Sequence, residues 1–307
     1  MIKPMLAVPM SKANITDWTD WIVEEKYDGH RLIVQVAHLH IWGAAKPESN
    51  VIAWTRPRQH AGATGKTMLE RPLPSHLIKQ LKVLPTGTYD GELVGGRTST
   101  DVSRLDVQAS LRFVVFDVLQ HEGADQMSRP LDQRRRLLAA IFRQDDVDAC
   151  EHLMISTAIR VTCQDDVTKF VTEVWTQGGE GAILKRRAAP YQPGKRSPDF
   201  VKVKKLFTEV MTVVGFEATR GKVMNRGPFA TVVLEDSKGN RTSVKTVDDV
   251  ELEKFNREWD QRSSITTHRD TPDTSHPALG RKLRIEYQDR TPDGGYRHPR
   301  WDRWEDE

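Results

Sequence analysis

The chain has 307 residues, 37% of them hydrophobic, so it is long enough for two folded domains and is not disordered in composition. Its formal net charge is only +3, which excludes binding to nucleic acid through a uniformly basic surface. The two cysteines, Cys150 and Cys163, exclude a disulfide framework or a cysteine-rich zinc site. No apolar run approaches membrane-spanning length. We therefore expect a soluble, cytoplasmic, monomeric protein.

The first two-thirds of the chain carry strand signals that are interrupted by two helices. Strands are predicted at residues 32–39, 51–55, 88–94, 111–119, 181–185 and 200–204. The strongest is 111–119, an almost continuous apolar run typical of a strand buried on both faces. Helices are predicted over residues 131–143 and 165–176, where Pro130 favours a start and Gly178 a stop.

The last third of the chain has a different pattern of predicted elements. Short strands are predicted at residues 210–217, 230–235, 242–246 and 281–287, with one helix over 248–259 and a polar loop over 263–280. Short strands with one helix are typical of a small, partly open barrel such as an OB-fold. We expect an α+β protein with one domain at residues 1–206 and an OB-fold domain at 207–307.

The most informative stretch is the charged segment from Glu25 to Arg31, which lies between two apolar runs. An amine attacks phosphorus only when it is deprotonated, so a nucleophilic Lys26 needs surroundings that favour the neutral form. The hydrophobic flanks and Arg31 offer such surroundings. Asp28 offers an acceptor beside the amine, and Gly29 allows close approach of a phosphate or sugar to the backbone. The alternative is a solvated hairpin with loosely paired charges.

Lys26-Tyr27-Asp28-Gly29-His30-Arg31 resembles the KxDGxR motif of the covalent nucleotidyltransferases and is most similar to that of ATP-dependent DNA ligases. The resemblance implies an adenylyltransferase domain of antiparallel sheets with flanking helices, followed by the OB-fold. It also implies that Lys26 attacks the α-phosphate of ATP and carries AMP as a phosphoramidate. Asp28 and Arg31 would belong to the same catalytic centre.

Further segments resemble the ligase motifs in the same order. They are Trp54-Thr55-Arg56, Asp90-Gly91-Glu92-Leu93, Phe116-Asp117, Glu180-Gly181-Ala182-Ile183-Leu184-Lys185, Lys202-Val203-Lys204 and Arg297-His298-Pro299-Arg300. The resemblance implies that Phe116 stacks on adenine, that Lys202 and Lys204 bind the α-phosphate, and that Arg297 and Arg300 orient the pyrophosphate. Glu24, Glu25 and Arg31 would also contact ATP or AMP. Tryptophan at position 301 replaces the family's usual phenylalanine.

Nucleotidyl transfer accumulates negative charge on phosphate oxygens, so the site needs Mg²⁺ on hard oxygen ligands together with fixed cations. Glu92 and Glu180 can hold the metal ion. The resemblance implies that both also belong to the ATP-binding site and that Glu92 contacts either the ribose or the metal. Lys202 and Lys204 stand two apart on one predicted strand, so both side chains project from the same face.

The predicted partner is nicked duplex DNA. The resemblance places the 5′-phosphate at Arg56, and the neighbouring basic residues Arg58 and Lys66 would help to hold the duplex. We expect weak binding that depends strongly on salt.

The leading hypothesis is an ATP-dependent DNA ligase that seals 5′-phosphate/3′-hydroxyl nicks through lysyl-AMP and a DNA-adenylate, in replication, repair or recombination. One alternative is an RNA ligase or an mRNA-capping nucleotidyltransferase. Another is a non-catalytic nucleic-acid-binding protein that uses the barrel.

Overall fold

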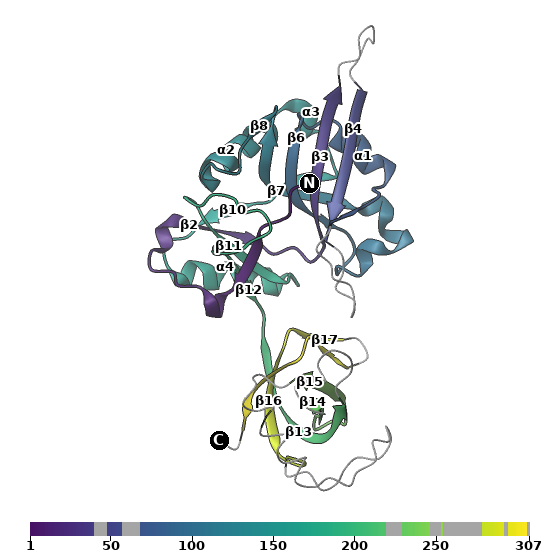
Figure 1. The fold of residues 1–307 in the computed structure, drawn as a ribbon, viewed down its shortest axis with the longest axis vertical. Helices are drawn as coiled ribbons and strands as arrows, with labels where there is room; N and C mark the ends of the chain where they lie inside the picture. Colours follow the sequence, from purple (N-terminus) through teal and green to yellow (C-terminus); the bar gives the residue numbers. More distant parts are fainter. Residues whose placement is uncertain are drawn as a thin grey trace. The chain divides into compact units, whose positions relative to one another are not determined.

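The computed structural model describes residues 1–39, 48–56, 68–218, 229–245, 253, 278–291 and 294–305 (Figure 1). The chain divides into two compact units, Met1–Lys204 and Lys205–Glu307, which we call unit 1 and unit 2. The predicted helix over 248–259 lies outside the described residues apart from Glu253, and so does the predicted loop over 263–280 apart from its last three residues. None of the helices in the described ranges is long and apolar enough to cross a membrane.

One sheet of unit 1, which we call sheet I, has the strand order β1-β12-β11-β2-β10. Its strands are β1 (Leu6–Pro9), β2 (Trp21–Glu25), β10 (Ala158–Arg160), β11 (Gly181–Arg186) and β12 (Arg196–Lys204). Helix α4 (Gln164–Thr176) covers one face, where Val23, Leu184 and Val201 form an apolar core with Val167 and Val171. Because side chains alternate along a strand, the intervening residues of β2, β11 and β12 project from the opposite face.

The other sheet of unit 1, which we call sheet II, has the order β5-β4-β3-β6-β7-β8, with β9 parallel to β7. Its strands are β3 (His30–Leu39), β4 (Glu48–Thr55), β5 (Leu69–Glu70), β6 (Gly87–Val94), β7 (Arg112–His121), β8 (Ala124–Asp125) and β9 (Leu153–Ile155). Helices α1 (Ser75–Leu81) and α2 (Leu131–Ile141) contribute Leu77 and Leu138 to the core on one face. On the other face, Ile33 packs with Phe200 of sheet I, so the two sheets face each other.

Strand β7 is irregular where it pairs with β6. Asp117 pairs with Asp90 but Val115 pairs with Gly91, so Phe116 is an extra residue without a cross-strand partner. A bulge of this kind changes the face to which a side chain points. The sequence predicts β7 as a plain buried strand, whereas the bulge shifts the alternation of side chains after Phe116, so that Val118 joins Phe113 and Val115 in the core.

The remaining short elements of unit 1 connect these layers. They are helix α3 (Asp145–Asp148) and the 3-10 helices η1 (Met10–Lys12), η2 (Trp18–Asp20), η3 (Asp101–Ser103) and η4 (Leu105–Ser110). The two helices predicted from the sequence are present as α2 and α4. Helix α1 is one that the sequence analysis missed, because it is only seven residues long and too short to show a clear period.

Unit 2 is built on a five-stranded antiparallel sheet with the order β15-β14-β13-β16-β19. The strands are β13 (Phe207–Ala218), β14 (Phe229–Glu235), β15 (Arg241–Lys245), β16 (Lys282–Tyr287) and β19 (Arg300–Trp304), and β17 (Asp289–Arg290) pairs with β18 (Tyr296–Arg297). The end strands β15 and β19 lie close to each other, so the sheet curls around a core that includes Val232, Leu283 and Trp301. The predicted α+β fold with a small barrel is confirmed.

Candidate active site

The facing surfaces of sheets I and II enclose a cavity of about 220 Å³. It is lined by Met5, Leu6, Ala7, Glu24, Glu25, Lys26, Tyr27, Arg31, Arg56, Glu92, Phe116, Ile183, Lys185, Arg196, Phe200 and Lys202. Apolar rings and a few convergent charges are the usual lining of a small-molecule site. Nine charged side chains from several segments meet here although they are spread over 179 positions of the chain, from Glu24 to Lys202.

Lys26 lies at the end of β2, directly after the strand, and its backbone N–H donates to the Gly181 carbonyl at 2.9 Å. Its ammonium group donates to Glu180 Oε2, and Lys204 Nζ lies 2.6 Å from Glu180 Oε1. Burial opposes ionisation of Glu180, but Lys26 and Lys204 together hold the pKa of its carboxyl below the usual value. The structure therefore brings together Lys26, Glu180 and Lys204, three residues that the motifs place far apart.

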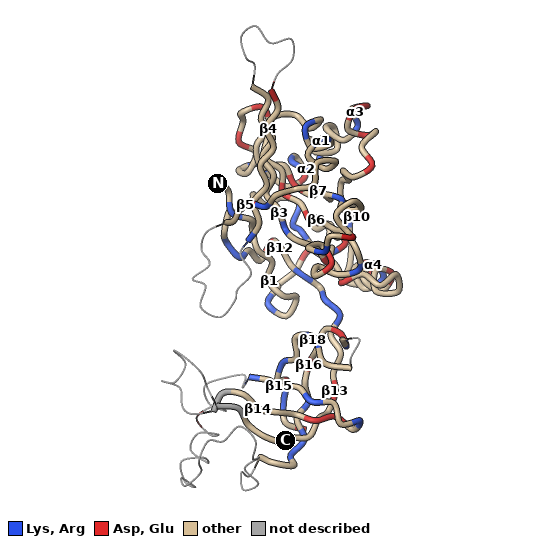
Figure 2. The backbone as a smooth tube through the Cα atoms, turned by 90° about the vertical axis from the view of Figure 1, so that its right-hand side faces the viewer, with Lys and Arg blue, Asp and Glu red and all other residues tan. Residues whose placement is uncertain are grey.

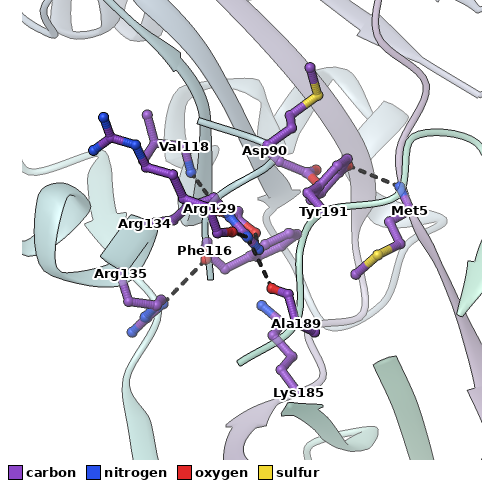
Figure 3. A network of polar contacts seen from close by, with 12 residues as sticks. Met5, Asp90, Phe116, Val118, Arg129, Arg134, Arg135, Lys185, Ala189 and Tyr191 are labelled. Atoms are coloured by element: carbon purple, nitrogen blue, oxygen red, sulfur yellow. Dashed lines mark hydrogen bonds and ion pairs between the residues drawn. The ribbon is translucent and has the colours of Figure 1, made fainter. Parts of the chain in front are cut away.

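Arg31 is fixed by Asp90 through two hydrogen bonds, Nε to Oδ1 at 2.5 Å and Nη2 to Oδ2 at 2.7 Å. Tyr191 also donates to Asp90 Oδ2 at 2.6 Å, and the Met5 N–H donates to the Tyr191 hydroxyl at 2.9 Å (Figure 3). Burial opposes the charge on Arg31, yet Asp90 raises the pKa of this guanidinium above its ordinary value. Arg31 is a rigid cation on the wall of the cavity.

Glu92 lies beside Arg31 on the neighbouring strand β6. Burial raises the pKa of Glu92 to about 7, and Arg31 and Lys26 counteract only part of this effect. A half-buried carboxylate whose charge is only partly compensated is a suitable ligand for a hard divalent cation.

We expect Glu92 to make the protein less stable as the pH rises. Its carboxyl binds its proton more tightly in the folded state than in the unfolded chain, so stability is lost from about pH 4.5 upward and fully lost above about pH 7. Glu92→Gln should remove this loss and make the variant about 1–2 kcal/mol more stable than wild type at pH 8, with little difference at pH 4.

Chemical denaturation at both pH values measures the effect, and Glu173→Gln on the exposed face of α4 is the matched control. Equal stability of wild type and Glu92→Gln at pH 8 would contradict the argument that burial of Glu92 costs stability when its carboxyl is ionised.

The Phe116 ring borders the cavity between cationic groups. Arg31 Cζ and Lys185 Nζ each lie 4.4 Å from its ring centroid. Lys185 also ion-pairs with Glu24 at 2.8 Å, and burial lowers the pKa of this lysine. The ring, the two cations and Glu24 form the inner end of the cavity.

Gly29 has a packing role that the sequence analysis did not predict. A Cβ on this residue would lie 2.3 Å from the Leu93 carbonyl oxygen and 2.9 Å from Glu92 Cγ. The absence of a side chain therefore lets the segment between Lys26 and Arg31 lie against strand β6. The expectation that Gly29 serves the close approach of a ligand stays a prediction.

Gly29→Ala should destabilise the protein by about 1–3 kcal/mol, because the new methyl group would collide with backbone that cannot move aside. The free energy of unfolding in urea measures the loss. Gly215→Ala is the control, since its Cβ would find its nearest neighbour at 3.8 Å. A loss no greater for Gly29→Ala than for Gly215→Ala would refute the packing argument.

For the other predicted residues the structure gives less. Asp28 is not among the lining residues. Arg58 and Lys66 lie outside the described residues, whereas Arg56 lines the cavity. Arg297 in β18 and Arg300 in β19 belong to unit 2.

Other lining residues were missed as site residues. Lys185 is the last residue of the Glu180–Lys185 motif. Only the pairing of β11 with β12 shows that its side chain shares a face of the sheet with Ile183 and Lys202. Phe200 and Arg196 belong to strand β12 upstream of the paired lysines, where no charge pattern marks them.

Comparisons with known proteins place the chain among DNA ligases in sequence and fold. Residues 79–204 match the family model of the ATP dependent DNA ligase domain. A DNA ligase of Methanosphaera stadtmanae is 30% identical over 246 residues, which are 76% of this chain and 41% of that protein. A DNA ligase of Archaeoglobus fulgidus is 32% identical over 146 residues, which are 47% of this chain and 25% of that protein. The chain thus spans well under half the length of these relatives.

A solved structure shares the fold of this chain. It comes from a study of Lig E DNA ligases described as binding DNA with a minimal scaffold, and it matches with a TM-score of 0.64, 18% identity and 99% coverage of both chains.

Proposed function

Because the chain carries an ATP-dependent DNA ligase domain over residues 79–204, we propose that it is an ATP-dependent DNA ligase that seals 5′-phosphate/3′-hydroxyl nicks in duplex DNA. The observation that carries the proposal is the position of Lys26. Its side chain lines a cavity that is the right kind of site for a nucleotide, and it contacts Glu180, which also holds Lys204. A solvated hairpin would not place these groups together.

In the first step, Lys26 Nζ attacks the α-phosphorus of ATP. A P–N bond forms, the bond from this phosphorus to the bridging oxygen of the β-phosphate breaks, and pyrophosphate leaves. Glu180 accepts a hydrogen bond from Lys26 and so holds the amine in place beside the cavity. Lys202 and Arg31 line the same cavity and supply fixed positive charge to the phosphates.

In the second step, a 5′-phosphate oxygen at the nick attacks the same phosphorus and breaks the P–N bond, which gives the DNA-adenylate and frees Lys26. In the third step, the 3′-hydroxyl attacks the phosphorus of the 5′-phosphate, a phosphodiester bond forms, and AMP leaves. Arg56 would hold the 5′-phosphate, because it lines the cavity on the side of sheet II.

Glu92 and Glu180 would hold Mg²⁺. The raised pKa of Glu92 shows that its carboxylate lacks compensating positive charge, and both side chains offer the hard oxygen ligands that this ion prefers. The metal ion would neutralise charge on the phosphates.

Within the cavity, Phe116 would stack on adenine and Glu24 and Glu25 would line the nucleotide pocket. Basic and acidic positions are both scattered over the described backbone of each unit (Figure 2), so binding to DNA should be weak. Because it depends on contacts of Lys and Arg with phosphates, it should also depend strongly on salt. Arg297 and Arg300 of unit 2 would orient the pyrophosphate.

Nick sealing tests the proposal. Purified protein with ATP and Mg²⁺ should join a nicked DNA duplex that carries a 5′-phosphate. It should not join one that carries a 5′-hydroxyl. Preferred joining of nicked RNA would favour an RNA ligase, and labelling by GTP but not ATP would favour a capping-type enzyme. Binding to DNA without any nucleotide transfer would favour a non-catalytic protein.

A further inference from the structure

A buried carboxylate of unit 2 holds Tyr296, the residue directly before Arg297 in strand β18. This carboxylate belongs to Asp236, which is 6% exposed and directly follows strand β14. Its Oδ2 accepts a hydrogen bond from the Tyr296 hydroxyl at 2.9 Å. Its Oδ1 accepts from the backbone N–H groups of Lys238 and Asn240, each at 2.8 Å. Asp236 therefore joins the turn after β14 to the β17–β18 hairpin.

Arg290 of β17 completes this network. Its Nη1 donates to Asp236 Oδ2 at 3.1 Å and to the Gly294 carbonyl at 3.0 Å, and its Nη2 donates to Glu209 Oε2 on strand β13. Its Cζ also lies 3.9 Å from the centroid of the Tyr296 ring. A guanidinium can hold several acceptors at once because its N–H groups point in fixed directions. Arg290 thus ties the hairpin to two other segments of unit 2.

The hairpin needs these side-chain contacts. Strands β17 and β18 are two residues long and form a two-stranded sheet of their own. A two-stranded ladder is marginally stable by itself, even when its strands are longer. The ladder alone therefore does not fix β18, and the contacts of Asp236, Arg290 and Tyr296 do.

The backbone directly after Arg297 is strained. Only two residues separate Arg297 at the end of β18 from Arg300 at the start of β19, and one of them, His298, has a φ of +54°. A residue other than glycine keeps this left-handed conformation only where the chain is held on both sides. Tyr296 on one side and Trp301 on the other belong to the core of unit 2. The two arginines therefore flank a turn whose geometry depends on these anchors.

We propose that Arg290 is a positioning residue for the formation of lysyl-AMP: together with Asp236 and Tyr296 it fixes β18 and so places Arg297 on the pyrophosphate. The inference rests on the proposed function, which assigns Arg297 to the pyrophosphate. Pyrophosphate leaves in the first step and takes no part in the later ones. Loss of the network should therefore slow the first step and spare the joining of DNA that is already adenylylated.

Two rates of the full chain test the inference. One is labelling of the protein by α-labelled ATP with Mg²⁺, and the other is sealing, without ATP, of a nicked duplex whose 5′-phosphate already carries AMP. Arg290→Met should lower the labelling rate at least about tenfold, because a small displacement of a charged group from the reacting phosphates is costly. It should change the sealing rate less than about twofold. Tyr296→Phe keeps the ring but loses the hydroxyl, so it should slow labelling a few-fold and spare sealing.

A control and a double variant separate positioning from general damage. Arg241 lies at the start of β15, where its exposed guanidinium ion-pairs with Glu235 at 2.7 Å, so Arg241→Met should label as wild type does. Arg290→Met is also combined with Arg297→Ala. If Arg290 acts through Arg297, it should change the residual labelling of Arg297→Ala less than about twofold, since residues that act as a unit are not additive.

Three results would overturn the inference. They are equal losses of labelling and sealing in Arg290→Met, a full tenfold loss on top of Arg297→Ala, and normal labelling by Arg297→Ala alone. If Arg290→Met does not fold, Tyr296→Phe decides by the same two rates. Failure of the proposed function differs, because wild type would then not label with ATP and the inference would fail with it. If wild type labels and seals but Arg290→Met and Tyr296→Phe label normally, the positioning inference fails alone.

Discussion

Lys26→Ala should abolish formation of the AMP adduct and, with it, nick sealing by ATP. The reason is chemical: the Lys26 amine is the group that forms the P–N bond in the proposed mechanism, and its side chain lines the cavity and contacts Glu180. We expect a loss of at least about 10⁴-fold in adduct formation, because the covalent route is removed and not merely weakened. Transfer of label from α-labelled ATP to protein measures it.

Sealing of DNA that is already adenylylated separates the steps. This third step does not need the Lys26 amine, so Lys26→Ala should retain part of it, which also shows that the variant is folded. Lys169→Ala is the matched control and should label as wild type does. Normal labelling of Lys26→Ala would contradict the assignment of the nucleophile.

Arg134→Leu should destabilise the protein by about 3–5 kcal/mol, because it leaves the charge of Asp117 buried and unpaired. Arg134 is almost fully buried on α2. It donates to Asp117 through Nε at 2.8 Å and Nη2 at 2.9 Å, and its Nη1 donates to the carbonyls of Arg129 and Ala189 (Figure 3). The free energy of unfolding in urea measures the loss.

Arg136→Leu is the control on the same helix. Its guanidinium is 77% exposed and only 4.0 Å from Asp132, so the change should cost under about 0.5 kcal/mol. The double variant Arg134→Leu with Asp117→Leu should recover part of the stability, since it removes the unpaired charge as well. Equal losses in Arg134→Leu and Arg136→Leu would show that the buried pair contributes nothing.

Much of the fold was predictable because its elements carry strong local patterns. The apolar run at 111–119, the helix start at Pro130 and the paired lysines of strand β12 all depend on neighbouring residues only. The barrel of unit 2 followed from short strands separated by glycine turns. The short helix α1 and the bulge at Phe116 could not be predicted, because a seven-residue helix shows little periodicity and a bulge depends on cross-strand register.

The candidate site was predictable where the motifs place a charge at the end of a strand. Lys26, Arg31, Arg56, Glu92, Phe116 and Lys202 all line one cavity. The partners of these residues were not predictable. The hydrogen bonds of Arg31 to Asp90 and of Tyr191 to Asp90 join segments that are 59 and 101 residues apart, and no local pattern encodes such contacts. The packing role of Gly29 was missed for the same reason, since it depends on strand β6.

The most direct test of the central claim is peptide mapping by mass spectrometry after incubation of the full chain with ATP and Mg²⁺. The account predicts one added AMP, located on the peptide that contains Lys26, released by acid and absent from Lys26→Ala. An AMP located on any other lysine, or an unmodified protein that nevertheless seals nicks with ATP, would contradict it.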